Sequence, residues 1–424
     1  MSSDTKPTAA LLPKLRFPGF SAPWTFEPIA NVLKEHKLKN TAGRDVFSVS
    51  MEFGVVNQIE LLGRSFAAAD TSHYTIGRRY DIVYTKSPLK AFPFGIVKQC
   101  KFDGEVALSP LYGVFAPINP HLGLLIEAYF ESPNRANSFL SPLCQKGAKN
   151  TLQITNATFL SGRLPLPAQP PEQQEIADCL SSVDELIAAQ ARKVDALKTH
   201  KKGLMQQLFP REGATQPRLR FPEFDAAADW EVQPLESLAD RGSGHTPSKN
   251  CPEYYGGGIK WVSLADSKRL DGGLIFKTET EISAQGIKKS SAVLHPAGTV
   301  LISRDAGVGK SAVMAEPMAV SQHFIVWTCH AHLLSNWFLY YQLQEMKPVF
   351  ERIATGSTIK TIGLPFFKEL TIAVPTVAEQ QRIAACLSSL DALITAKTQK
   401  LEALKTHKQG LMQQLFPAPE ETEA

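Results

Sequence analysis

At 424 residues the chain is too long for a single hydrophobic core, so two or three domains are expected. Its 43% hydrophobic and 20% charged residues are typical of a globular protein, and no apolar run approaches the about 18 residues of a membrane span. The net charge of +4 allows a nucleic-acid partner without indicating one, because an electrostatic footprint must be clustered.

The cysteines and the N-terminal stretch indicate which classes of protein can be set aside. The six cysteines are scattered and none forms a CxxC pair, so the sequence predicts neither a metal site nor a disulfide framework. The N-terminal stretch lacks the apolar core of a signal peptide. We therefore expect a cytoplasmic protein without a metal and without a membrane partner.

The chain opens with a short lead-in, residues 1–23, that returns in the middle of the sequence. Its phrase KLRFPGF at 14–20 is followed by Trp24, and RLRFPEF at 218–224 is followed by Trp230. The second copy lies in a linker segment, residues 211–229. We predict that these aromatic and proline residues pack on a domain surface; a clip that docks on a helix or a domain edge is the alternative.

Two globular segments follow the lead-ins, at residues 24–164 and 230–374. In the first, alternating apolar residues predict short strands at 46–50, 81–85 and 113–115. In the second, similar patterns predict strands at 259–263, 299–303 and 324–327, and residues 336–352 are typical of a helix. Both segments run in the order strand, basic polar loop, strand, serine-bearing loop, which suggests a shared fold despite little common sequence.

Each globular segment leads into a long helix, and the two helices are near copies. The central repeat helix lies in residues 165–210, and the C-terminal repeat helix with its tail in residues 375–424. Residues 172–210 and 379–417, here called the rods, share 28 of 39 positions at a constant offset of 207. Their apolar residues alternate steps of three and four, the spacing of a coiled-coil seam. An amphipathic helix buried on its own domain is the plainer alternative.

The predicted seam has equivalent members in both rods. They are Ile176, Leu180, Val183, Ile187, Val194, Leu197, Leu204, Leu208, Ile383, Leu387, Leu390, Ile394, Leu401, Leu404, Leu411 and Leu415. Four polar residues interrupt it at matching places, Gln190 with Lys397 and Lys201 with Lys408. These either fix the register of the two helices or face partner subunits.

The repeat predicts the architecture. We expect a mixed α/β fold in which two globular domains are separated by two long antiparallel helices that form an intramolecular coiled coil. A pseudo-two-fold, circular symmetry would relate the halves. Under that symmetry the two ends of the chain lie close together.

Catalytic motifs were sought without success. Residues 306–311, AGVGKS, superficially resemble a phosphate-binding loop, but the position that needs the first glycine holds Arg304. A glycine turn between strands explains this stretch better. Asn119-Pro120-His121 is not the Asn-Pro-Pro-aromatic motif of amino-methyltransferases, and no nucleophile–base signature is present. We predict a recognition chain with no catalytic residues and no cofactor of its own.

Several motifs resemble the specificity subunit of a type I restriction-modification system. They are the proline followed closely by Glu-Gln at the start of each rod, in Pro170–Gln173 and Pro375–Gln380, the lead-in LRFPEF, and GHTPS at 244–248 followed by YYGGGIKWV at 254–262. The first globular segment matches more loosely, through DIVY at 81–84 and LSPLY at 108–112. The resemblance covers nearly the whole chain.

The resemblance implies a function. Each globular segment would be a target recognition domain that reads one half of a gapped site in double-stranded DNA, and the rods would fix the gap. The rods would also dock two modification (methyltransferase) subunits that carry S-adenosylmethionine. Restriction subunits would supply the ATP-dependent translocation and cleavage. The chain itself would be a non-catalytic DNA-binding subunit.

Candidate DNA-contacting residues are those with hydrogen-bonding edges or positive charge in the polar loops. They are Arg78, Arg79, Lys86, Ser87 and Lys90 in the first domain, and His245, Thr246, Ser248, Lys249, Arg304, Lys310 and Gln322 in the second. The alternative from another class is an antiparallel coiled-coil scaffold whose globular domains bind proteins. An enzyme that uses Gly309-Lys310-Ser311 for phosphate is disfavoured.

Overall fold

The computed structural model describes residues 11–146 and 152–417. The first residues of the lead-in and the last residues of the tail therefore lie outside the described chain. Two compact units are present: one combines Met1–Ala191 with Lys400–Ala424, and the other is Arg192–Gln399. Each long helix contributes to both units. No helix among the described residues is long and apolar enough to cross a membrane.

The described part of the first unit is built on two sheets and two strand pairs. The sheet β2-β9-β6-β7 consists of β2 (Leu33–Glu35), β9 (Gly113–Pro117), β6 (Ile82–Thr85) and β7 (Ile96–Gln99). The sheet β4-β3-β8-β5 consists of β4 (Gly54–Asn57), β3 (Val46–Ser50), β8 (Glu105–Leu108) and β5 (Thr75–Arg78). The pairs are β1 (Thr25–Pro28) with β12 (Arg163–Leu166), and β10 (Gln145–Lys146) with β11 (Leu152–Gln153).

Short helices complete the first unit, and local sequence explains where the longest of them begins. They are α1 (Ile29–Val32), α2 (Gln58–Leu62), α3 (Pro120–Phe130), α4 (Pro133–Leu140) and α5 (Asn156–Ser161). The Asn119 side chain accepts a hydrogen bond from the Leu122 amide, and Pro120 occupies the first turn of α3. The Asn119-Pro120 pair is thus a helix start.

The second unit repeats this plan. Its larger sheet, β14-β21-β18-β19-β16, consists of β14 (Ala239–Ser243), β21 (Phe324–Cys329), β18 (Val300–Ser303), β19 (Ser311–Met314) and β16 (Leu274–Ile275). The other, β17-β15-β20, consists of β17 (Thr280–Ile282), β15 (Tyr255–Val262) and β20 (Ala319–Val320). A ribbon pairs β13 (Glu231–Pro234) with β22 (Thr371–Val374). The helices are α7 (Leu235–Leu238), α8 (Ala284–Lys288), α9 (Asn336–Glu345), α10 (Lys347–Ile353) and α11 (Leu364–Lys368), with 3-10 turns η2 (Pro222–Phe224), η3 (Pro252–Tyr254) and η4 (Leu264–Asp266).

The two units share most of their topology, as the shared loop order suggested; they differ in that β5 pairs with β8 in the first unit, whereas β16 pairs with β19 in the second. The order β2-β9-β6-β7 corresponds to β14-β21-β18-β19. In each unit a parallel strand pair, β3 with β8 or β15 with β20, joins the second sheet just before the serine-bearing turn. Equivalent loops therefore leave the sheets at equivalent places.

The prediction of a single helix over residues 336–352 is wrong. The structure divides it into α9 and α10, with a turn at Met346. Pro348 lies in the first turn of α10, where its missing backbone N–H is tolerated, whereas it would break the hydrogen-bond ladder inside a continuous helix. The remaining predicted strands lie within one or a few residues of β3, β6, β9, β15, β18 and β21.

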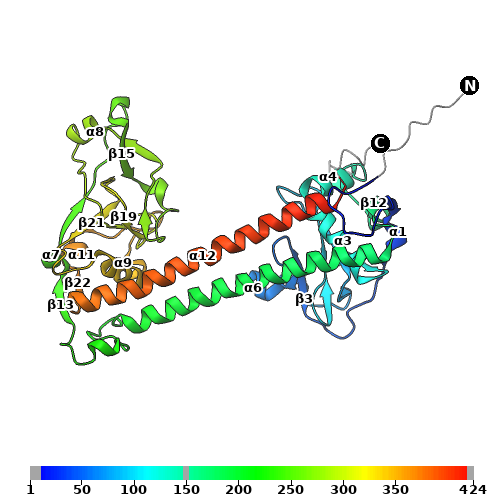
Figure 1. The fold of residues 1–424 in the computed structure, drawn as a ribbon, viewed down its shortest axis with the longest axis horizontal. Helices are drawn as coiled ribbons and strands as arrows, with labels where there is room; N and C mark the ends of the chain where they lie inside the picture. The colour runs from blue at the N-terminus through cyan, green and yellow to red at the C-terminus, as the bar shows by residue number, and fades with distance from the viewer. Residues whose placement is uncertain (1–10, 147–151, 418–424) are drawn as a thin grey trace, which may run out of the picture. The chain divides into compact units, whose positions relative to one another are not determined.

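Nearly all of each rod is helical, in α6 (Pro170–Leu208) and α12 (Val377–Leu415), two helices of 39 residues each (Figure 1). In the first unit the core takes Ile176 and Leu180 from the start of α6 and Leu415 from the end of α12. In the second unit the core takes Ile383 and Leu387 from the start of α12, with Leu208 from the end of α6. In each unit, therefore, the start of one helix packs with the end of the other, and the two helix segments are antiparallel.

The predicted seam residues are shielded from solvent. Half or more of them are buried, namely Ile176, Leu180, Val183, Val194, Leu208, Ile383, Leu387, Leu401 and Leu415. The others are intermediate in exposure, and none is fully exposed: Ile187, Leu197, Leu204, Leu390, Ile394, Leu404 and Leu411. The seam residues of both helices are thus buried or half-buried, and the mixed α/β fold with an antiparallel coil is the one expected.

A buried ion pair connects each lead-in to the start of a rod. Arg16 donates from Nε and Nη2 to the two carboxylate oxygens of Glu172, at 2.7 and 2.9 Å. The indole N–H of Trp24 donates to the same carboxylate at 3.2 Å. The Glu172 side chain is only 1% exposed, so its charge depends on these donors. The lead-in is therefore a clip on a helix start.

The second unit reproduces this clip. Arg220 donates from Nε and Nη2 to Glu379 at 2.9 and 2.6 Å, and the indole N–H of Trp230 donates at 3.2 Å. The next residue of each rod, Gln173 or Gln380, donates to the carbonyl oxygen of Pro167 or Pro375. The Glu-Gln pair at the start of each rod thus fixes how each globular domain enters its helix.

The two ends of the described chain meet, as expected from the symmetry. The Leu15 amide donates to the Gln414 carbonyl oxygen at 2.9 Å. In the second unit, the Leu219 amide donates to Gln207, the residue equivalent to Gln414, at 3.0 Å. The N-terminal lead-in therefore contacts the end of α12 as the second lead-in contacts the end of α6.

Replacing the buried carboxylate should destabilise the unit that contains it. We expect Glu172→Gln to lower the free energy of unfolding by about 3–5 kcal/mol, because it leaves the Arg16 guanidinium without its counter-charge. Urea unfolding followed by circular dichroism measures the change. Glu175→Gln, on the exposed face of the same helix, is the matched control and should differ little from wild type. Equal stability of the two variants would contradict the proposed importance of the clip.

A circular permutant tests the symmetry directly. A chain opened within residues 211–217 and joined across the natural termini should fold with a circular-dichroism spectrum and melting behaviour close to wild type, since Leu15 already bonds Gln414. Failure of the permutant to fold would argue against equivalence of the two junctions.

Candidate nucleic-acid interface

The second unit contains a polar cleft of about 500 Å³ where its two sheets meet. Three stretches supply the walls: the segment after β14, strand β15, and the turn between β20 and β21. The lining residues are Thr246, Lys249, Tyr255, Trp261, Ser263, Leu264, Ala265, Thr280, Ser321, Gln322 and His323. Hydroxyl, amide, imidazole and ammonium groups beside two aromatic rings are suited to the base edges and phosphates of a nucleic acid.

Hydrogen bonds join the walls of this cleft. The Trp261 indole N–H donates to the carbonyl oxygen of His245 at 3.1 Å, and the Tyr255 hydroxyl donates to that of Pro247 at 2.6 Å. The Thr246 hydroxyl donates to the Gln322 side-chain oxygen at 2.5 Å. The GHTPS and YYGGGIKWV motifs, separate in sequence, therefore form one structure.

Gly244 permits this close approach. A Cβ atom at this position would lie 1.7 Å from the Val320 carbonyl oxygen, so no other residue fits without movement of the backbone. The segment after β14 can thus lie directly against the end of β20. This places Thr246 beside the turn that carries Gln322.

The β20–β21 turn presents both a satisfied and an unsatisfied polar group. His323 Nδ1 lies 2.8 Å from an Asp305 carboxylate oxygen, which holds the imidazole in place. The Ser321 hydroxyl is buried, and no partner for it is found among the described residues. Because a buried hydroxyl is costly without a hydrogen bond, this lining group suits a water or a bound polar edge.

The structure brings most of the predicted residues of the second domain to the cleft or its border, but not Lys310. Thr246, Lys249 and Gln322 line the cleft, and His245 and Ser248 are exposed in the same segment. Arg304 borders the cleft through its amide, which donates to the His323 carbonyl oxygen at 2.9 Å, but its side chain is mostly covered. Lys310 lies elsewhere, since its ammonium donates to the Ser267 carbonyl oxygen at 3.0 Å.

The loop that resembles a phosphate-binding loop connects two antiparallel strands, β18 and β19. A phosphate loop instead ends at a helix N-terminus, whose amides bind the anion. Gly307 and Gly309 adopt positive φ values of 111° and 82° to make the turn. The turn between strands favoured by the sequence is the observed structure.

The predicted residues of the first domain lie at two opposite ends of strand β6. Arg78 and Arg79 precede this strand and form ion pairs with Glu105 and Asp103, at 3.1 and 3.3 Å. Lys86 and Ser87 follow it directly, and Lys90 lies further along the same loop. All five are exposed, but the structure does not bring the arginines together with the other three.

The end of β6 that carries Lys86 corresponds to the cleft of the second unit. Tyr84 pairs with Gly113, as Ser303 pairs with Phe324, so the loop from Lys86 leaves the sheet beside the turn at residues 109–112. Ser48 and Ser109 occupy the places of Ser263 and Ser321 after the parallel strand pair. The first domain thus presents a related surface at this end.

Sequence reasoning missed Trp261, Ser263, Ser321 and His323 as lining residues. The parallel pairing of Trp261 with Ala319 brings these segments together across 58 positions. Such a pairing leaves no local periodicity. The one available signal was the serine that follows a strand in both halves.

The chain is similar to known proteins over most of its length. A family model described as the type I restriction modification DNA specificity domain matches residues 75–199 and 227–406, more than half of the chain. The MjaIX specificity subunit of Methanocaldococcus jannaschii, a type I restriction enzyme, is 30% identical over 178 residues. That match covers 42% of this chain and 41% of the relative, so the chain matches less than two thirds of that relative's length.

Two further curated relatives and two solved structures extend the comparison. The putative MjaX specificity subunit of the same organism is 24% identical over 70% of this chain and 68% of its own. The EcoR124I/EcoR124II subunit of Escherichia coli is 27% identical over 42% of this chain and 44% of its own.

The type I S subunit from M. genitalium matches with a TM-score of 0.58 at 14% identity, covering 96% of this chain and 99% of that one. A chain from a study of complex assembly in the type I R-M system matches with a TM-score of 0.54 at 17% identity, covering 96% and 100%. These two structures support the fold.

Replacements in the cleft should separate base reading from phosphate binding. We expect Gln322→Ala to lower affinity for the preferred duplex by about 1–3 kcal/mol and to relax selectivity at one position. Lys249→Ala should weaken binding to all sequences alike and reduce the salt slope by about 1. Lys310→Ala removes the same charge outside the cleft and is the matched control. A salt slope changed by Lys310→Ala and unaffected by Lys249→Ala would exclude this cleft as the interface.

Proposed function

Because the chain belongs to the type I restriction-modification DNA specificity family, we propose that it binds a bipartite, gapped site in double-stranded DNA. Each globular domain reads one half-site, and the base pairs between the halves are not read. The observation that carries this proposal is the repetition of one topology in two units, each with a polar turn at the equivalent strand ends.

The proposal assigns recognition to this chain. Its support is that the cleft holds hydrogen-bonding and positively charged groups suited to recognition, and that the loop of Gly309 and Lys310 is a strand connection. Under the proposal the chemistry belongs to partners: two methyltransferase subunits that use S-adenosylmethionine, and restriction subunits that use ATP. We place the docking surface for these partners on the exposed faces of α6 and α12, whose seam residues are already covered.

The length of the helices sets the gap under this proposal. Inserting one heptad within residues 180–204 and another within 387–411 adds about 10 Å of helix, the rise of roughly three base pairs. We expect the preferred gap to lengthen while both half-sites stay the same. Binding to a series of duplexes with different gaps measures this.

A mobility-shift assay with and without the co-expressed methyltransferase tests the function itself. We expect the complex to shift a duplex that carries both half-sites, and to bind duplexes with one half-site much more weakly. If the complex bound no duplex, the function as a protein-binding scaffold would replace this proposal. A heptad insertion that abolished one half-site preference would contradict the role of the helices as a spacer.

A further inference from the structure

Two of the four polar interruptions of the seam, Lys201 and Lys408, form equivalent ion pairs. In the second unit, Lys201 on α6 lies 2.6 Å from an Asp391 carboxylate oxygen on α12. In the first unit, Lys408 on α12 lies 2.8 Å from an Asp184 carboxylate oxygen on α6. Lys201 and Lys408 are repeat equivalents, as are Asp184 and Asp391. One cross-helix pair, in one antiparallel register, therefore occurs in each unit.

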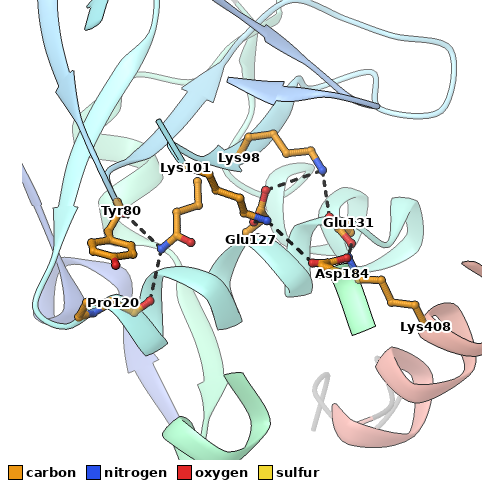
Figure 2. A network of polar contacts seen from close by, with 9 residues as sticks. Tyr80, Lys98, Lys101, Pro120, Glu127, Glu131, Asp184 and Lys408 are labelled. Atoms are coloured by element: carbon orange, nitrogen blue, oxygen red, sulfur yellow. Dashed lines mark hydrogen bonds and ion pairs between the residues drawn. The ribbon is translucent and has the colours of Figure 1, made fainter. Parts of the chain in front are cut away.

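In the first unit this pair belongs to a closed ring of six alternating charges (Figure 2). Lys408 contacts Glu131 at the end of α3 as well as Asp184, both at 2.8 Å. The ring continues through Lys98 and Lys101, at the end of β7, and closes through Glu127 on α3. It connects both long helices with the helix and the sheet of the globular domain.

Four members of the ring are well shielded, whereas Asp184 is 32% and Lys101 55% exposed, and the charges of the ring are balanced. The side chains of Lys98 and Glu127 are each 6% exposed, and that of Lys408 is 14% exposed. Burial lowers the pKa of Lys408, but Glu131 and Asp184 outweigh that effect and raise it to about 12. Burial likewise raises the pKa of Glu131, and the ammonium groups of Lys98 and Lys408 outweigh it, so this pKa is lowered. Lys408 and Glu131 are therefore both charged near neutral pH.

The second unit connects its pair to the domain by a smaller arrangement. The Tyr341 hydroxyl, on α9, donates to the second carboxylate oxygen of Asp391 at 2.8 Å. The Lys201 ammonium lies 5.1 Å from the centre of the Tyr341 ring, within range of a cation–π contact. Helix α9 is the counterpart of α3, so the repeated pair contacts the equivalent helix in each unit through different chemistry.

A lysine in a seam is costly unless its ammonium is paired, and the pair exists in one register only. Sliding one helix along the other by a turn would move each ammonium about 5 Å from its carboxylate. The apolar seam alone resists this less, because leucine and isoleucine recur along it every three or four positions. The charged pairs are therefore the features that distinguish the observed register from its neighbours.

We infer that the pairs Lys201–Asp391 and Lys408–Asp184 are positioning residues that fix the helix register and the seating of each domain, and thereby the gap between half-sites. This inference rests on the proposed function. The sequence left open whether Lys201 and Lys408 fix the register of the two helices or face partner subunits, and this inference favours the register. These lysines do not read DNA; they determine where the reading domains are held.

The experiment measures gap selectivity in the complex with the methyltransferase. Affinities are determined for duplexes with the preferred gap and with gaps one base pair shorter or longer. We expect Lys201→Met and Lys408→Met each to reduce the preference for the correct gap by about tenfold. Lys193→Met and Lys400→Met, at exposed repeat-equivalent positions of the same helices, should leave it unchanged. Circular dichroism and co-purification with the methyltransferase establish that each variant is folded.

Charge exchange distinguishes a register role from general stabilisation. The double variant Lys201→Asp with Asp391→Lys should restore the preference, since the Tyr341 hydroxyl can also accept a hydrogen bond. The same exchange at Lys408 and Asp184 should fail, because Glu131 and Lys101 would then face like charges. Lys408→Arg, which keeps the charge, should behave almost as wild type.

The outcomes separate the inference from the proposed function. A wild-type complex without any gap preference would refute the function itself. A wild-type preference that Lys201→Met and Lys408→Met both leave intact would refute the inference alone. So would a loss of preference that the exchange in the second unit does not restore.

Discussion

The buried carboxylate at the start of each long helix is the contact on which the rest of the structure depends. Glu172 and Glu379 are each held by an arginine and a tryptophan of the preceding lead-in, with nearly the same distances in both units. A carboxylate that is 1% exposed is stable only when its donors stay in place. This single group therefore fixes the lead-in, the entrance to the helix and the edge of the globular domain together.

The parts of the chain that make these contacts are repeated in both halves, whereas the globular domains differ in sequence. The lead-ins and the rods repeat almost unchanged, and they supply the clip, the seam and the cross-helix ion pairs. The globular domains keep the topology but change the residues at the strand ends, where the second unit has Ser321 and Gln322 and the first has Ser109 and Pro110. The proposed reading of two different half-sites requires this separation, in which the lead-ins and rods stay constant and the residues at the strand ends vary.

The frame and the domains are coupled by charge as well as by apolar packing. In the first unit a ring of six side chains connects α6 and α12 to α3 and β7. In the second unit the hydroxyl of Tyr341, on α9, makes the corresponding connection by donating a hydrogen bond to Asp391 on α12. Buried charges add less net stability than apolar residues of the same volume, but they tolerate only one geometry. Under the proposed function their value is positional, because domains that drifted on their helices would no longer meet two half-sites at once.

The sequence by itself determined the parts that obey local periods or internal repetition. The heptad spacing predicted both long helices, the offset of 207 predicted their equivalence, and the strand patterns predicted six strands of the sheets. Only the tertiary structure decided the cleft. Thr246, Trp261 and Gln322 meet through a parallel strand pairing and a glycine contact between distant segments. Arg78 and Lys86, close in sequence, lie at opposite ends of one strand, and Lys310 is committed to a carbonyl oxygen. A period is a property of consecutive residues and can be read from them, whereas a site depends on which distant strands pair.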